Sequence, residues 1–309
     1  MRKAGRGTAL YLTFQRIGVQ YGFVIRHSFR YAKNERGRKV KIGRQDRHSS
    51  AISTSNAETI VVRGRDLTRE LIGSISFTEH FWLLVTGALP TEAQRRVLDA
   101  TLVAIAEHGL VPSVQASRMT LAAAPEALQG AVAAGILGCG SVVLGSSEAA
   151  GQFLAEVAGR DGATANPENA IAEVVREYRQ AKRAIPGYGH PLHSRGDPRA
   201  IRLLEVATEA GVAGRHVEIA TTVEKLLPQL VGRPLALNVS GAIPAVLLDA
   251  GYPLLALKGV PLLARTASLV AHLLEEQERA IGFVMSHAAA QAIDYDGDAP
   301  SGFQPSEDA

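Results

Sequence analysis

One histidine and one arginine stand close together in a segment rich in glycine and proline. Residues 186–199 read Pro-Gly-Tyr-Gly-His-Pro-Leu-His-Ser-Arg-Gly-Asp-Pro-Arg. The glycines permit backbone angles that a side chain would forbid, and Pro191 disfavours helical geometry at the residue before it, so we expect His190 to project from a stiff loop. Such a histidine can donate or accept a proton near neutral pH. The residues alone leave a second interpretation open, a plain Gly/Pro turn leading into a capped helix.

The end of the same segment is typical of a helix start. Asp197 is expected as the N-cap, and Pro198 suits the first helical position. Arg199 then falls in the first turn, where unpaired amides and the positive end of the helix dipole favour a carboxylate or phosphate. The segment as a whole therefore predicts a site for an anionic substrate.

The composition favours an all-α, helix-rich globular protein. Aromatic residues make up only 5% of the 309 residues, while alanine and leucine are abundant. The length fits one two-lobed unit or two domains. The single Cys139 excludes an internal disulfide framework and a CxxC zinc site. We therefore expect a reducing, cytoplasmic location.

Positive charge is concentrated at the N-terminus. Residues 1–50 hold 13 of the 33 Lys and Arg residues but only two of the 30 acidic ones, so the remainder is acidic and no nucleic-acid partner is expected. We interpret residues 1–44 as a basic, disordered extension; a nucleic-acid or membrane-surface arm, or a start codon chosen too far upstream, are the alternatives. The leader is too polar to span a bilayer and residues 131–144 are only a core helix long, so no membrane partner is expected.

From about Ile60 onward the hydrophobic spacing is helical, without strand-like alternation of useful length. Residues 76–79 and 91–94 are predicted capping boxes, and Gly87 is the predicted end of the helix between them. Further helices are expected over residues 118–144, 173–182, 240–250 and 264–279, with a surface loop over 159–169. Together these expected helices predict an all-α fold.

Four segments resemble motifs of the citrate synthase superfamily, and they occur in the order that the family requires. They are residues 76–91, Glu107-His108-Gly109, Gly189-His190 with Asp197-Pro198-Arg199, and Ala264-Arg265-Thr266 followed by His272. The second segment is most similar to the C-terminal part of ATP-citrate lyase. Each motif is weak alone, but their collinear order identifies the chain as a member of this superfamily.

The resemblance implies an all-α, citrate synthase-like fold with a large helical domain plus a smaller helical domain. Residues 45–148 and 256–295 would form the large domain, residues 149–255 the small domain, and residues 296–309 a tail. The active unit implied is a homodimer, with its site in the cleft between the lobes.

The resemblance also implies a role for each matching residue. His108 and His190 would contact the hydroxyl or carbonyl oxygen of the substrate. Arg199 and Arg265 would bind its carboxylates through their planar forks, and Arg279 is a further candidate for a carboxylate contact from the partner subunit.

The residues by themselves leave other interpretations of these positions open. His108 can be a polar residue at a helix end before Gly109, and Arg265 can be a surface arginine. His193 lies three residues after His190, but no third ligand pattern accompanies the pair, so no metal is expected.

Two departures from the family pattern bear on the reaction. The condensing citrate synthases have a histidine where this chain has Val143; ATP-citrate lyase also lacks it, which favours the lyase-like branch. The family aspartate is replaced by Ser240, which we expect to keep the helix-capping hydrogen bond but not the carboxylate. Loss of a positioned acid or base typically lowers a rate about 10²–10⁴-fold. Asp249, at the far end of that helix, is not expected to substitute.

The function implied is that of a citryl-CoA lyase, which cleaves citryl-CoA or a related 3-hydroxy-acyl-CoA to acetyl-CoA and oxaloacetate. CoA would be part of the substrate, and no separate cofactor is expected. One alternative is a condensing enzyme that makes citrate or methylcitrate. The other is a catalytically impaired homologue that binds an acyl-CoA or a tricarboxylate, such as citrate, as a sensor or scaffold.

Overall fold

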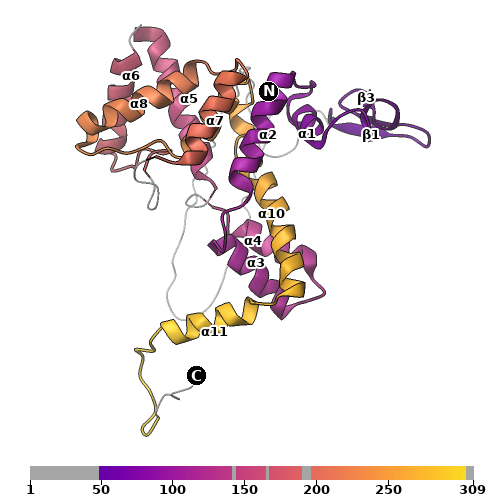
Figure 1. Ribbon diagram of the computed structural model, residues 1–309, viewed down its shortest axis with the longest axis vertical. Helices are drawn as coiled ribbons and strands as arrows, with labels where there is room; N and C mark the ends of the chain where they lie inside the picture. Colours follow the sequence, from indigo (N-terminus) through magenta and orange to yellow (C-terminus); the bar gives the residue numbers. More distant parts are fainter. Residues whose placement is uncertain (1–48, 141–143, 165–166, 190–195, 304–309) are drawn as a thin grey trace, which may run out of the picture. The chain divides into compact units, whose positions relative to one another are not determined.

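The computed structural model describes residues 49–140, 144–164, 167–189 and 196–303 (Figure 1). The chain divides into Met1–Ser50 and Ala51–Ala309, and the account below concerns the second unit. Val143, His190 and His193 lie outside the described residues, as does the basic leader over residues 1–44. What the sequence predicts for these positions stays a prediction.

Helices dominate the described part of the chain, as the composition and spacing predicted. In chain order they are η1 (Leu67–Leu71), α1 (Phe77–Thr86), α2 (Glu92–Ala106), α3 (Pro112–Ala123), α4 (Leu128–Leu137), α5 (Ser146–Thr164), α6 (Pro167–Gln180), α7 (Pro198–Glu209), α8 (Arg215–Val231), α9 (Val239–Asp249), η2 (Leu254–Ala256), α10 (Gly259–Glu278) and α11 (Gly282–Ala292). The prediction of an all-α fold is confirmed.

Three short antiparallel strands precede the helices. They are β1 (Ser53–Ser55), β2 (Ile60–Val62) and β3 (Arg65–Asp66), in the order β1-β2-β3. The expectation of helix from Ile60 onward is therefore wrong for residues 60–66. Arg63 and Gly64 both have positive φ, of 50° and 81°, which produces a tight two-residue hairpin turn. Strands of two or three residues are too short to show an alternating pattern.

The local helix signals are confirmed where side chains cap the first turn. Ser76 and Glu79 form the predicted capping box of α1, and Thr91 and Gln94 form that of α2. Gly87 ends α1 in the left-handed conformation, with a φ of 84°.

The structure refines one helix prediction and contradicts one loop prediction. Residues 118–144, expected as further helix, are divided between α3 and α4, because Pro125 separates the two helices. The loop expected over residues 159–169 is instead largely helical, since α5 runs to Thr164 and α6 begins at Pro167. Packing outweighs the low helix propensity of glycine there: α5 contacts α6, and Arg160 pairs with Glu177 across them at 2.6 Å.

The core is organised around α9, which is buried along most of its length and contacts α2, α5, α7 and α8. Helices α5, α6 and α8 also contact one another (Figure 1). A second set of contacts joins α10 to α2, α3 and α4, and α11 packs on α3. The division into a large and a small lobe stays a prediction, because residues 51–309 form one compact unit.

Residues Leu254–Glu278 are long and apolar enough to cross a membrane by length and composition, with a mean hydropathy of 1.5. Core helices of globular proteins meet the same criterion. The contacts of α10 with α2, α3 and α4 favour this second interpretation, as does the burial of the charged side chains of Arg265 and Glu276.

Candidate active site

The predicted anion-binding segment packs directly onto the N-terminus of α9. Gly187 and Gly189 adopt positive φ values of 89° and 82°, as the sequence predicted. The backbone N–H of Asn238 donates to the carbonyl of Gly187 at 3.0 Å. A Cβ added to Gly187 would lie 2.7 Å from the Cα of Gly241, so the close approach to α9 requires glycine as well. The backbone that leads into His190 is therefore held against α9.

Asp197 connects the start of α7 to the start of α9. Its Oδ1 accepts hydrogen bonds from the backbone N–H of Arg199 at 3.1 Å and from Arg199 Nε at 3.0 Å. Its Oδ2 accepts from Arg199 Nη2 and from the backbone N–H of Val239, both at 2.9 Å. Burial raises the pKa of Asp197, but these hydrogen bonds outweigh it, and the pKa lies below its usual value.

The predicted cap and first-turn positions at the start of α7 are confirmed. Asp197 is the N-cap and only 1% exposed, and Arg199 lies in the first turn of α7. The guanidinium of Arg199 is turned toward Asp197, a partner that no sequence pattern indicated. A substrate carboxylate can therefore be bound only by the N–H groups that Asp197 does not use.

Ser240 is the second residue of α9, and the expectation that it caps this helix is wrong. The N-cap is Asn238, whose Oδ1 accepts from the backbone N–H of Gly241 at 3.2 Å. Asn238 Nδ2 also donates to the carbonyl of Gly189 at 2.7 Å. The Ser240 hydroxyl instead accepts a hydrogen bond from Ser146 Oγ at 2.9 Å. Ser146 starts α5, and no local pattern in the sequence indicated this contact.

Asp249 is engaged at the opposite end of α9. Its carboxylate accepts from the backbone N–H groups of Gly214, His216 and Val217 at 2.7, 2.9 and 3.0 Å, and it lies 2.8 Å from His216 Nδ1. The carboxylate therefore caps the first turn of α8. This geometry agrees with the expectation that Asp249 does not replace the family aspartate.

Arg265 lies on α10 and is buried, with only 2% of its surface exposed, so it is not a surface arginine. Within the part of the chain that the structure describes, its Nε and Nη1 have no hydrogen-bond partner. Burial lowers the pKa of Arg265, although the nearby negative charge of Glu107 opposes this. A buried cation with unpaired donors is costly unless an anion compensates it. The site around Arg265 is thus suited to a carboxylate.

Glu107 fixes the segment that contains His108 against α10. Its carboxylate accepts hydrogen bonds from Ser268 Oγ and from the backbone N–H of Gly109, and it lies 3.0 Å from His272 Nε2. Burial raises the pKa of Glu107, but these hydrogen bonds hold it at about 2. His108, the next residue, is exposed just beyond the end of α2.

The predicted site residues thus fall into two groups and one outlier. Arg199 and Ser240 lie together at the N-terminus of α9, while His108 and Arg265 lie where the end of α2 meets α10. Helix α2 contacts α7 and α9 as well as α10, so it connects the two groups. The side chain of Arg279 is exposed just beyond the end of α10.

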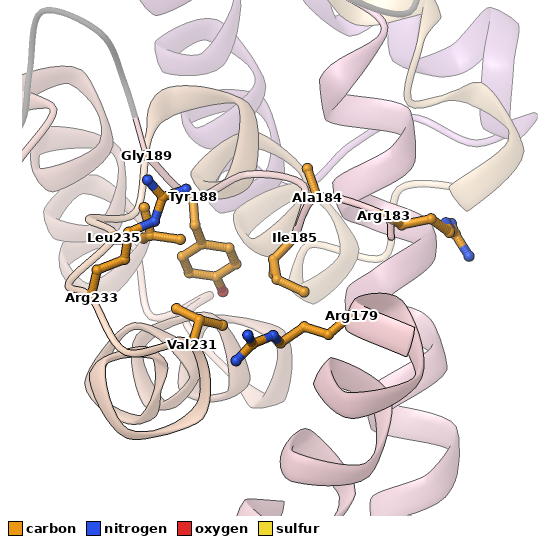
Figure 2. Close-up of a pocket in the computed structure, with 9 residues that line it drawn as sticks. All are labelled: Arg179, Arg183, Ala184, Ile185, Tyr188, Gly189, Val231, Arg233 and Leu235. Carbon is orange, nitrogen blue, oxygen red and sulfur yellow. The ribbon is translucent and has the colours of Figure 1, made fainter. Parts of the chain in front are cut away.

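A cavity of about 600 Å³, which no sequence pattern indicated, lies beside the first group. Its lining comes from the end of α6, residues 183–189, the end of α8 and the segment after it (Figure 2): Arg179, Arg183, Ala184, Ile185, Tyr188, Gly189, Val231, Arg233 and Leu235. Arg179 donates to the carbonyl of Leu230, and the Arg183 guanidinium lies 3.9 Å from the centre of the Tyr178 ring. Arginines around apolar walls suit a ligand that has both phosphate and ring groups.

The helical architecture and the arginine-lined site define a citrate synthase-like protein. The model of the citrate synthase C-terminal domain matches residues 92–282. The chain therefore belongs to the citrate synthase family, and its similarity to solved structures supports the citryl-CoA lyase-like branch. The structure of citryl-CoA lyase from Hydrogenobacter thermophilus is 31% identical, with a TM-score of 0.73, over 83% of this chain and 97% of that one.

One further solved structure shares the fold, and a curated relative is similar in sequence. The ATP citrate lyase of Methanothrix soehngenii, solved with citrate and coenzyme A, is 21% identical with a TM-score of 0.66, over 86% of this chain and 44% of that one. The citrate/2-methylcitrate synthase of Bacillus subtilis (strain 168) is 26% identical over 208 residues, which is 66% of this chain and 53% of that protein. The chain thus spans about half the length of the curated relatives it matches.

Proposed function

We propose that this protein is a citryl-CoA lyase, which cleaves citryl-CoA or a related 3-hydroxy-acyl-CoA to acetyl-CoA and oxaloacetate. The observation that carries the proposal is the buried guanidinium of Arg265 with two unpaired donors. Citryl-CoA has free carboxylates next to the hydroxyl group that reacts. A carboxylate placed on Arg265 would compensate the buried charge and orient the substrate at the same time.

The remaining roles follow from the chemistry of the cleavage. A histidine, His108 or His190, accepts the proton of the substrate hydroxyl. The carbon–carbon bond then breaks, the hydroxyl carbon becomes the ketone of oxaloacetate, and the electron pair passes to the acetyl thioester as its enolate. The histidine returns a proton to the enolate carbon, which completes acetyl-CoA. Arg199 and Arg265 bind the carboxylates, and Arg279 is a further contact from the partner subunit.

Two alternatives have support of their own. A condensing enzyme that makes citrate or methylcitrate is favoured by the relatives named citrate synthase, while Val143 in place of the family histidine argues against it. A catalytically impaired homologue is favoured by Ser240, which offers a hydroxyl where the family has a carboxylate.

The deciding experiment is incubation of the purified protein with citryl-CoA while oxaloacetate release is followed. We expect release by the wild type and a loss of about 100-fold or more in His190→Ala, because a positioned acid or base is removed. His287→Ala, in an exposed position on α11, is the matched control. Binding of citrate or CoA without turnover would favour the impaired homologue, and turnover in the condensing direction alone would favour the synthase.

We further propose that the arginine-lined cavity binds the phosphates and adenine of CoA. It ends at Gly189, one residue before His190, which would bring the thioester toward the reacting groups. Arg233→Met is expected to weaken CoA binding about tenfold, as the loss of one charge-assisted hydrogen bond implies. The dissociation constant is measured by titration calorimetry. Arg176→Met, exposed on α6 outside the cavity, should leave it unchanged; an equal effect of both variants would contradict this placement.

We propose that the active unit is a cytoplasmic homodimer. Apolar side chains are exposed on neighbouring helices that contact α3 or α4: Leu137, Leu274, Phe283 and Val284. Exposed apolar groups of this kind are typical of subunit interfaces. Analytical ultracentrifugation tests the proposal, and a monomer at micromolar concentration would contradict it.

A further inference from the structure

Ser146 has no role in the function proposed above, yet it lies at the candidate site. It is the first residue of α5, and its Oγ donates a hydrogen bond to Ser240 Oγ at 2.9 Å. Ser240 is the second residue of α9, and the two helices contact each other. Both hydroxyls thus belong to first turns, and in α9 the N–H groups of Val239 and Gly241 already donate to Asp197 and Asn238. The positive end of the helix dipole still favours negative charge near a first turn.

The direction of the hydrogen bond decides what Ser240 can offer. A serine hydroxyl has one proton to donate and can accept at its oxygen. The hydrogen bond joins two hydroxyls, either of which can donate; when Ser146 donates, the proton of Ser240 is available for another acceptor. The Ser240 side chain is partly exposed, and its neighbour Asn238 holds the carbonyl of Gly189, next to His190. A bound substrate can therefore reach the Ser240 hydroxyl close to Gly189.

We propose that Ser146 is a positioning residue that orients Ser240 as a hydrogen-bond donor to the thioester oxygen of the substrate. The inference rests on the proposed lyase function. When the carbon–carbon bond breaks, negative charge develops on that oxygen in the enolate, and a donor aimed at it stabilises the transition state. Ser240 keeps its proton throughout, so no base is needed to activate it. The serine thus gives this chain a donor where the family has a carboxylate.

The test compares variants of the two serines by steady-state kinetics on citryl-CoA. Ser240→Ala is expected to lower kcat about 100-fold with little change in KM, as loss of an oxyanion donor does. Ser146→Ala should lower kcat about tenfold, because the donor is still present but no longer oriented. Ser146→Thr keeps the hydroxyl and should restore kcat to within about threefold of the wild type. Ser147→Ala removes a buried hydroxyl outside the pair and serves as the control.

A double variant separates positioning from an independent effect. If Ser146 acts only through Ser240, Ser146→Ala combined with Ser240→Ala should be no slower than Ser240→Ala alone. If the decreases in kcat of the two single variants multiply in the double variant, the inference is overturned. A rise in KM with kcat unchanged would also overturn it, because the pair would then bind a carboxylate of the substrate in the ground state. Circular dichroism and thermal unfolding check that each variant is folded.

A readout without turnover keeps this inference distinct from the proposed function. A CoA thioether with a carboxymethyl group mimics the charge of the enolate, and its dissociation constant is measured by calorimetry. We expect Ser146→Ala and Ser240→Ala to weaken its binding about tenfold, while Ser147→Ala does not. If the wild type does not cleave citryl-CoA, the proposed function is wrong. If the affinity for the thioether is unchanged in both serine variants, the inference about Ser146 and Ser240 is wrong.

Discussion

Arg265→Met should abolish citryl-CoA cleavage while leaving the fold as stable as before or more stable. In the wild type Arg265 is 2% exposed, and its Nε and Nη1 have no partner among the described residues. A methionine has a similar shape without the charge. In the protein without substrate, this substitution removes the free-energy cost of a buried, desolvated cation and breaks no ion pair. The substrate loses its buried cation, and kcat/KM should fall about 100-fold or more. Activity and stability are expected to change in opposite directions.

Oxaloacetate release and thermal unfolding of the same preparations test this result. Arg69→Met is the matched control, because Arg69 has a side chain that is 85% exposed and pairs only at 3.8 Å with Asp66. Arg265→Lys keeps a charge but not the planar fork and should recover little activity. A clear fall in the melting temperature of Arg265→Met would show that the arginine is paired without substrate. Unchanged activity would place the substrate carboxylate elsewhere.

Arg118→Met should destabilise the protein by about 3–5 kcal/mol, the usual effect of removing one partner of a buried ion pair. The Arg118 side chain is 3% exposed; its Nε lies 2.6 Å from Glu276, and its Nη1 lies 2.8 Å from Glu275. Its Nη2 also donates to the carbonyl of Arg279 at 3.0 Å. Without Arg118, the carboxylate of Glu276 stays buried without its cation. The arginine therefore holds α3 to the end of α10.

Chemical denaturation and hydrogen exchange measure this effect. Glu276 also accepts from the backbone N–H groups of Ile281 and Gly282, so amide exchange should rise at the start of α11 in particular. Arg118→Met combined with Glu276→Gln should destabilise less than the sum of the two single changes. Arg202→Met, in an exposed ion pair with Glu205, should change stability by less than about 1 kcal/mol. Equal effects of the two arginine variants would contradict the prediction.

The pH dependence gives an independent check on the same pair. Burial raises the pKa of Glu276, but hydrogen bonds from Arg118, Gly282 and Ile281 lower it more, so the folded pKa lies below the ordinary 4.5. A carboxyl with a lowered folded pKa stabilises the protein above its unfolded pKa, and this contribution is lost as the pH falls through the folded value. Stability should therefore fall in acid below about pH 4.5, and less steeply in Arg118→Met than in the wild type.

The sequence predicted the local features of the site because they depend on neighbours within a few residues. The left-handed glycines at 187 and 189 follow from backbone sterics. The helix start at Asp197 and Pro198, like the capping boxes at Ser76 and Thr91, follows from hydrogen bonds across one turn. The order of such motifs along the chain was enough to identify the family. The hairpin before α1 was missed because its strands are too short to have a period.

What only the tertiary structure decided depends on helices that are distant in sequence. Ser146 meets Ser240 across 94 positions, and Glu107 meets His272 across 165. The burial of Arg265 results from the contacts of α10 with α2, α3 and α4, whereas the sequence around it fits a surface helix equally well. Local propensity acts through hydrogen bonds and sterics over a few residues, while these contacts are selected by the packing of whole helix faces. The amino-acid sequence thus determined the family and the chemical groups, and packing determined which of those groups are buried and which of them contact one another.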